Sequence, residues 1–216
     1  MHPAPALVGL LIEAYEPCKG FADSCRTATW NPAAGHAPRG FCGATGELGE
    51  VRLVLVCAEP GDPHPSECHE TGDSAAERFN SVSSYAWSCF SAGKDQFHRN
   101  VRSLLNLCWP GLTFDEQMRK TWITDSVLCS AARECGPVPR EMEKGCATRF
   151  LIPQLSQFPR ATIVALGRKA EGRLIRAGVR NFESAYSVAP PGCNQAAARL
   201  SWERVAEVVR ARTAQG

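Results

Sequence analysis

The sequence predicts an α/β fold in which a central parallel sheet of about four strands is covered by helices on both faces. Short apolar runs rich in β-branched residues alternate along the chain with longer segments of helical periodicity. Loops rich in Pro and Gly separate these segments, and no internal repeat or low-complexity linker interrupts them. The length of 216 residues suits one hydrophobic core, so we expect residues 1–216 to form a single domain.

The first part of the chain predicts a helix, an irregular segment and a buried strand. Residues 5–15 are expected to form a short helix. Residues 16–49 are rich in Gly, Pro, Ala and Cys without sustained periodicity, which predicts an irregular, cysteine-containing segment that something must hold in place. Residues 51–57, VRLVLVC, are typical of a strand buried in a parallel sheet. The loop after this strand lies where open α/β sheets place their chemistry.

The middle of the chain predicts further helices around a second strand. Residues 74–88 are expected to be helical in part, and residues 96–107 carry apolar side chains at helical spacing. Residues 121–128, TWITDSVL, predict the second strand. A helix is expected over 139–157, with Pro139 at its N-terminus.

The last part of the chain continues the alternation. Residues 161–166, ATIVAL, predict a third strand, after which Gly167 opens a helix over 168–177. Residues 184–188 predict a weaker fourth strand, and residues 196–213 the last helix.

Composition leaves the function open and argues against a membrane protein. The net charge is +2, with 44% hydrophobic and 21% charged residues, so a nucleic-acid role has to rest on local motifs. No run approaches the roughly 20 apolar residues that span a membrane. The apolar stretch 6–12 lacks a basic region before it and runs directly into Glu13, which predicts a helix and not a signal peptide. We expect a cytoplasmic protein with no membrane partner and no obligate protein partner.

Three segments at the ends of predicted strands carry the candidate chemistry. They are VLVCAEPG at 54–61, WITDSVLCSA at 122–131 and VAPPGCN at 188–194. In this order they resemble the uracil-DNA glycosylase superfamily, namely its water-activating loop, its base-reading strand and the loop that presses on the minor groove. Segments 137–146 and 161–170 resemble the linking helix and strand of the iron–sulphur branch. The resemblance covers most of residues 42–205 and implies a three-layer α/β/α sandwich that flips a nucleotide and hydrolyses its base–sugar bond.

Glu59 is the candidate catalytic residue. It stands where the superfamily usually has Asp, Asn or Ala. Cleavage of a glycosidic bond builds positive charge on the sugar, and a carboxylate below C1′ can stabilise that charge and activate water. The resemblance also places Ala58 and Pro60 beside the substrate. The alternative is that Glu59 is a solvated loop residue.

Gly61 and Asp125 predict which base is bound. Gly61 stands where uracil-specific members have a Tyr that excludes substituents at C5 of the base, although it also serves simply as a turn residue. Asp125 stands where the superfamily commonly has Asn, and a carboxylate has no donor for O4 of uracil. An unpaired buried acceptor costs roughly 1–3 kcal/mol. Cytosine offers an N4 amino group instead, and a protonated Asp125 would also donate to N3. The alternative role of Asp125 is to cap a turn.

These two residues together predict that the excised base is a C5-modified cytosine. The pattern resembles the bacterial anti-phage glycosylases that remove glucosylated hydroxymethylcytosine from phage DNA and leave an abasic site. No lysine stands in a motif position for lyase chemistry, so we expect a monofunctional DNA N-glycosylase. Two alternatives remain. One is a uracil-DNA glycosylase of base excision repair, and the other is a non-catalytic binder of modified DNA, because Ala189 replaces the superfamily's His.

Further residues are expected to contact DNA. The loop of the third segment comprises Pro190, Pro191, Gly192, Cys193 and Asn194. Phe90 is predicted to stack on the flipped base, with Phe79 and Phe97 as alternatives. The basic residues that would position phosphates are Lys94, His98, Arg99, Arg133, Arg140 and Arg199.

Eleven cysteines, an odd number at scattered spacings, do not resemble a secreted disulfide scaffold. Cys129 and Cys146 match one pair of ligands of the iron–sulphur branch, and Cys18 and Cys25 lie where the other pair would be. Four thiolates suit a [4Fe–4S] cluster or zinc, and such a group would hold segment 16–49 to the domain. The remaining alternatives are Cys42 and Cys135 as substitute ligands, or unligated buried thiols with no cofactor.

Overall fold

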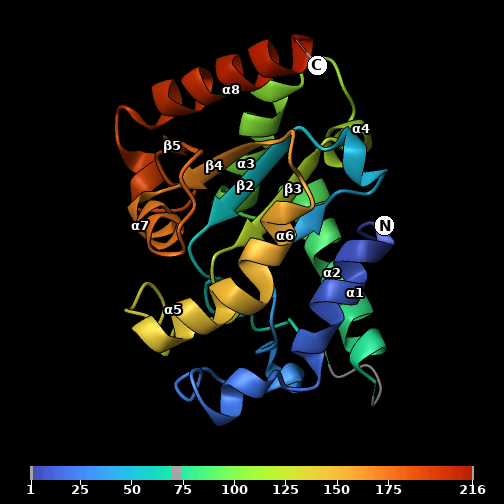
Figure 1. Cartoon of the computed structure of the whole chain (residues 1–216), viewed down its shortest axis with the longest axis vertical. Helices are drawn as coiled ribbons and strands as arrows, with labels where there is room; N and C mark the ends of the chain where they lie inside the picture. The colour runs from blue at the N-terminus through green and yellow to red at the C-terminus, as the bar shows by residue number, and fades with distance from the viewer. Residues whose placement is uncertain (1, 70–73, 216) are drawn as a thin grey trace.

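The computed structural model describes residues 2–69 and 74–215 and places one five-stranded sheet at the centre of the molecule. Figure 1 shows this sheet with helices around it. The strands are β1 (Cys42–Gly43), β2 (Leu53–Cys57), β3 (Thr121–Asp125), β4 (Thr162–Leu166) and β5 (Glu183–Ala185). Their order is β1-β3-β2-β4-β5, and every neighbouring pair is parallel except β1 and β3.

The α-helices occupy the segments between the strands and both ends of the described chain. They are α1 (Pro5–Leu11), α2 (Ala75–Ala92), α3 (Gln96–Cys108), α4 (Phe114–Arg119), α5 (Arg140–Cys146), α6 (Ile152–Ser156), α7 (Arg168–Arg176) and α8 (Ala198–Ala214). Short 3₁₀ turns lie at Ile12–Tyr15, Lys19–Ala22, Pro32–Ala34, Leu48–Glu50 and Gly192–Asn194.

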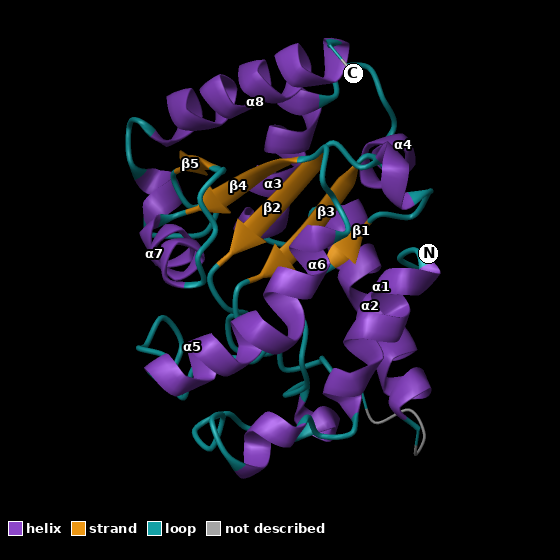
Figure 2. Cartoon of the chain, in the orientation of Figure 1, coloured by secondary structure: helices purple, strands orange, loops and turns teal. Residues whose placement is uncertain are grey.

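The sheet separates two hydrophobic clusters, which makes the fold a layered α/β structure (Figure 2). Alternate side chains of a strand point to opposite faces. Val54 and Val56 therefore join the cluster that contains residues of α1, α5 and α7, whereas Leu53 and Leu55 join the cluster of α3 and α8. Burying a side chain of this size contributes roughly 1.5–3 kcal/mol to folding. The predicted fold class, an α/β sandwich around a mostly parallel sheet, is confirmed.

Some details differ from the prediction. The sheet has five strands because Cys42 and Gly43, inside the segment expected to be irregular, pair antiparallel with Ile123 and Trp122. Two residues are too few to produce a periodic signal. Helix α4 was also not predicted, although the capping box formed by Thr113 and Glu116 marks its start in the sequence.

The helix predicted over 139–157 contains a wider turn. Between α5 and α6, residues Ala147–Leu151 are π-helical. Pro153 lies in the first turn of α6 and has no amide hydrogen, so it cannot bond the carbonyl of Arg149 in the usual way. The wider turn follows directly after Cys146.

Within residues 2–69 and 74–215, no helix combines the length and the apolar character that crossing a bilayer requires.

Candidate active site at the carboxyl ends of the parallel strands

The ends of β2 and β3 bring the first two predicted segments together. Strands β2 and β3 lie side by side in Figure 1, and Cys57 and Asp125 are partners in their parallel register. The pairing continues beyond the strands, since the amide of Ser126 donates to the carbonyl of Cys57 at 2.9 Å and the amide of Val127 to that of Ala58 at 3.1 Å. Ala58 and its neighbour Glu59 therefore lie at the same edge of the sheet as Asp125, because parallel strands end together.

Asp125 is a buried carboxyl group whose neutral form is favoured. The residue is 5% exposed. Burial raises the pKa of Asp125 well above its ordinary value, and the negative charge of Glu59 raises it further, against the lowering effects of Arg39 and Arg173. Its carboxyl group points toward the chain at Gly40, where a Cβ atom would lie only 1.7 Å from Oδ2. Asp125 thus faces backbone across a contact that only glycine allows.

Glu59 is held by two cations. Its side chain is 7% exposed, so the structure contradicts the alternative of a solvated loop residue. Lys169 Nζ lies 2.8 Å from Oε1 and Arg173 Nη2 lies 2.6 Å from Oε2, the latter as an ion pair without hydrogen-bond geometry. Lys169 also donates to the carbonyls of Cys135 and Gly136, both at 3.0 Å.

Lys169 and Arg173 were not found by sequence reasoning. Both lie on α7, four residues apart and hence on one face of the helix. This spacing in a helix after β4 was the available signal, but nothing in the sequence shows which loop that face meets.

The carbonyl of Gly61 is held by hydrogen bonds, whereas the space beside its α-carbon is open. The carbonyl accepts hydrogen bonds from the Arg39 guanidinium and from Ser130 Oγ, the latter at 2.8 Å. Gly61 is exposed, and a Cβ there would meet only Oε1 of the exposed side chain of Glu134, at 3.1 Å. Pro60 is half-buried between this loop and Glu59. The volume beside Gly61 can therefore be enlarged by the movement of one flexible side chain.

Arg39 also holds the far end of this loop. It pairs with Glu67 at 3.5 Å, and Glu67 accepts a hydrogen bond from His69 at 2.9 Å. Although burial raises the pKa of Glu67, the contacts with His69 and Arg39 outweigh it and lower that pKa. All three residues are buried, so the loop after β2 has an internal ionic anchor.

The third predicted segment lies against the first turn of α3. Asn100 Nδ2 donates to the carbonyl of Val188 at 2.8 Å, and Gln96 Nε2 donates to Asn194 Oδ1 at 3.3 Å. Pro190, Pro191 and Asn194 are exposed, with a cis peptide bond between the two prolines, while Gly192 and Cys193 are half-buried. The loop is accessible to a large partner, and its contact with DNA stays a prediction.

The predicted stacking ring is buried. Phe90 is 3% exposed, with the ring centroids of His98 and Phe97 at 4.7 and 5.8 Å. Phe79 is likewise in the core, stacked on Phe41, whereas Phe97 is half-buried. Among these three rings, Phe97 leaves the most surface for a base.

The basic residues expected at the DNA surface are mostly exposed. Several already have protein partners, such as Lys94 with the Tyr85 hydroxyl, His98 with Asp95 and Arg199 with Glu203. Arg99, Arg133 and Arg140 are exposed. No structural observation singles out one of them as a phosphate ligand.

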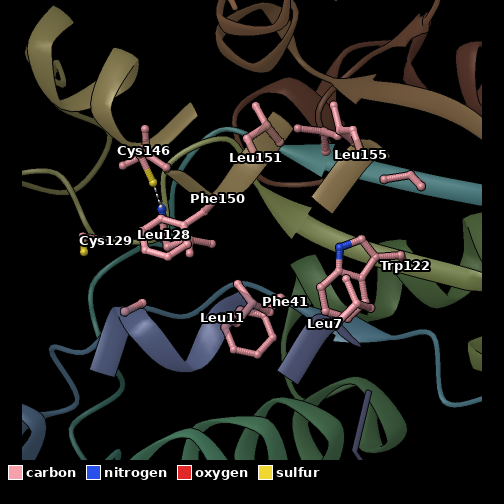
Figure 3. Close-up of a cluster of buried hydrophobic side chains, with 14 of the residues drawn as sticks. Leu7, Leu11, Phe41, Trp122, Leu128, Cys129, Cys146, Phe150, Leu151 and Leu155 are labelled. Atoms are coloured by element: carbon pink, nitrogen blue, oxygen red, sulfur yellow. Dashed lines mark hydrogen bonds between the residues drawn. The ribbon is translucent and has the colours of Figure 1, made fainter. Parts of the chain in front are cut away.

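The four cysteines Cys18, Cys25, Cys129 and Cys146 line one cavity between segment 16–49 and the ends of β3 and α5. Figure 3 shows Cys129 and Cys146 at the edge of an apolar cluster. The cavity walls also include Pro38. Cys42 and Cys135, the proposed substitutes, do not line it.

The surroundings of these four thiols differ. Burial raises the pKa of Cys129 and raises that of Cys146 to about 12. The hydrogen bond with Cys18 raises the pKa of Cys25, so only Cys18 is held in a form that favours the thiolate. The amide of Leu128 donates to Cys146 Sγ at 3.4 Å. A hydrogen bond from Cys25 and one from the amide of Gly20 lower the pKa of Cys18 to about 6 against the effect of burial. A Cβ at Gly20 would lie 2.8 Å from Cys25 Sγ, so only glycine fits between the two sulfurs. In the described part of the chain, no three His, Cys, Asp or Glu side chains are arranged around a single-ion site.

The fold and this site define an α/β protein with two carboxyl groups at adjacent strand ends and a four-cysteine cavity behind them. Comparison with models of protein families and with curated proteins finds no match for the chain. Function is therefore inferred from the residues and geometry described above.

Proposed function

We propose that the protein is a DNA glycosylase that flips a pyrimidine nucleotide and hydrolyses the bond between C1′ and the base. One observation carries the proposal: two neighbouring carboxyl groups lie in different electrostatic environments. Glu59 contacts two cations, Lys169 and Arg173, whereas burial and the charge of Glu59 raise the pKa of Asp125. Pairs of this kind divide the work of acid and charged stabiliser in glycosidic cleavage.

The two groups would have separate tasks. The C1′–N1 bond breaks with its electron pair leaving on the base, and the oxygen of water then bonds to C1′. Charged Glu59 stabilises the positive sugar and orients the water. Both oxygens of Glu59 contact cations, so its task is to stabilise charge, and the proton of water passes to solvent or to the departing base.

The neutral form of Asp125 changes the argument about the base. A carboxylic acid has one donor and one acceptor, so it can donate to N3 of cytosine and accept from its N4 amino group. It can equally donate to O4 of uracil and accept from N3–H. Hydrogen bonding alone thus keeps the uracil enzyme as a second candidate. The open side of Gly61 favours a substituent at C5, and for this reason a C5-modified cytosine remains the proposed substrate class.

A panel of duplex oligonucleotides tests the proposal. They carry uracil, cytosine, 5-hydroxymethylcytosine or its glucosylated form at one position, and abasic sites are detected by alkaline strand cleavage. We expect the protein to release a 5-modified cytosine. We expect oligonucleotides that carry unmodified cytosine to stay uncleaved. Release of uracil alone would establish the repair alternative, and tight binding without release of any base would establish the non-catalytic one.

We further propose that Cys18, Cys25, Cys129 and Cys146 hold a [4Fe–4S] cluster. Their shared cavity and the amide donors to their sulfurs support it. When bound, such a group would join segment 16–49 to β3 and α5, a structural role. A cytoplasmic location, proposed from the sequence, is compatible with a substrate in DNA.

The cofactor proposal predicts a coloured protein. Chain purified without oxygen is expected to show visible iron–sulphur absorbance and about four iron atoms per molecule. Cys146→Ala should lose both the absorbance and the iron. Cys108→Ala removes a buried thiol from the hydrophobic core on the opposite face of the sheet and should keep both. A colourless protein with one zinc would establish the zinc alternative, and a protein with neither metal would leave the cysteines as free thiols.

A further inference from the structure

Arg173 connects the two strand ends that form the candidate active site. It lies on α7 and is 5% exposed. Its Nη1 donates to the carbonyl of Ala58 at 2.6 Å and to Ser126 Oγ at 3.1 Å, while Nη2 lies 2.6 Å from Glu59 Oε2. One guanidinium therefore contacts both the loop after β2 and the loop after β3.

A second carboxylate, that of Glu143, also pairs with the buried guanidinium of Arg173. Arg173 Nε donates to Glu143 Oε1 on α5 at 3.1 Å. A buried arginine is tolerated only when its charge and its donors are matched. The planar fork with five N–H donors suits these divergent acceptors, and a lysine ammonium would reach fewer of them.

The charge of Arg173 acts on both carboxyl groups of the site. It is in direct contact with Glu59. Arg39 and, to a smaller extent, Arg173 lower the pKa of Asp125 against burial and the charge of Glu59. Loss of Arg173 would therefore raise the pKa of Asp125 further.

We propose that Arg173 is a positioning residue of the reaction, which fixes Glu59 relative to Asp125 and sets the pH range in which the pair works. This inference rests on the proposed glycosylase function. Arg173 has no contact with substrate in this role, because Nε and Nη1 donate to the protein and Nη2 faces Glu59.

The test is the pH dependence of base release in single turnover. In the wild type, release requires neutral Asp125, so the rate should fall as the pH rises through the raised pKa of Asp125. In Arg173→Gln this fall should move to higher pH, because a cation that lowers the pKa of Asp125 has been removed. Arg176→Gln is the matched control, since Arg176 on the same helix bonds Glu143 at 2.8 Å without contacting Glu59. The pH profile of Arg176→Gln should not shift.

Two further measurements keep the test decisive. Arg173→Lys retains the charge if the glutamine variant does not fold, and it should keep the pH profile while lowering the rate. Carbon-13 NMR of labelled carboxyl groups follows the titration of Asp125 without any substrate. The proposal would be overturned if Arg173→Gln were slower but the fall in rate at high pH and the titration of Asp125 were both unshifted. Absence of base release by the wild type would instead overturn the glycosylase function, and a moved titration would then assign Arg173 only to the electrostatics of the pair.

Discussion

Glu59→Gln is expected to lower the single-turnover rate of base release by roughly 10²–10⁴-fold, a range typical for the loss of a catalytic acid–base or charge-stabilising group. The amide keeps the shape of the side chain but removes the negative charge that faces the developing positive sugar. Lys169 would then lose its carboxylate partner, and Arg173 would keep only Glu143, so the excess positive charge near the sugar works in the same direction. The rate is measured by quenched-flow sampling followed by strand cleavage at the abasic site.

A matched control separates chemistry from folding. Glu171→Gln removes a carboxylate from α7 that accepts a hydrogen bond from Ser184 at 2.9 Å and lies outside the pair. It should leave the rate unchanged. Glu59→Gln should remain folded by circular dichroism, because Glu143 still pairs with Arg173. Full activity of a folded Glu59→Gln would contradict the assigned mechanism.

Gly40→Ala is expected to lower the free energy of unfolding by more than 2 kcal/mol and to abolish base release. The φ angle of +88° by itself costs an L-residue about 1–2 kcal/mol. In addition, the new Cβ would lie 1.7 Å from Asp125 Oδ2, so the carboxyl group must leave its place. Urea unfolding and the oligonucleotide assay measure the two effects.

Gly178→Ala is the control for backbone strain. Its φ angle is +84°, but no atom lies within 4 Å of the added Cβ. It should lose about 1–2 kcal/mol and keep its activity. Adding Asp125→Ala to Gly40→Ala should recover part of the lost stability, since the two side chains compete for one space. Equal stability of the two glycine variants would show that Asp125 does not press on Gly40.

The parts of the fold that could be predicted are those with a long local signal. The apolar run 51–57 and its counterpart at 161–166 have no alternative to a buried strand, and their alternation with helices sets the layers. The proximity of Glu59 and Asp125 also followed, because parallel strands end at one edge of a sheet. The gathering of the four cysteines was expected from a resemblance and not from their spacing.

The parts that could not be predicted depend on contacts between distant segments. The sequence alone does not show that α7 turns Lys169 and Arg173 toward Glu59. Without these two partners, Glu59 could equally have been a solvated loop residue. Nor does the sequence show that Asp125 is buried enough to favour a neutral acid, which alters the hydrogen bonds that it offers to a base. Gly40 gave no signal, since its φ angle and its neighbour come from tertiary structure.

Three consecutive residues connect the four-cysteine cavity with the candidate active site. Pro38 forms part of the cavity wall beside the cysteines, the amide of Arg39 bonds the carbonyl of Leu128, and Gly40 lies against Asp125. Inserting or deleting a single residue here would shift the wall of the four-cysteine cavity and the surroundings of the Asp125 carboxyl group together. Evolution can therefore vary the length of the chain on either side of this tripeptide more freely than within it.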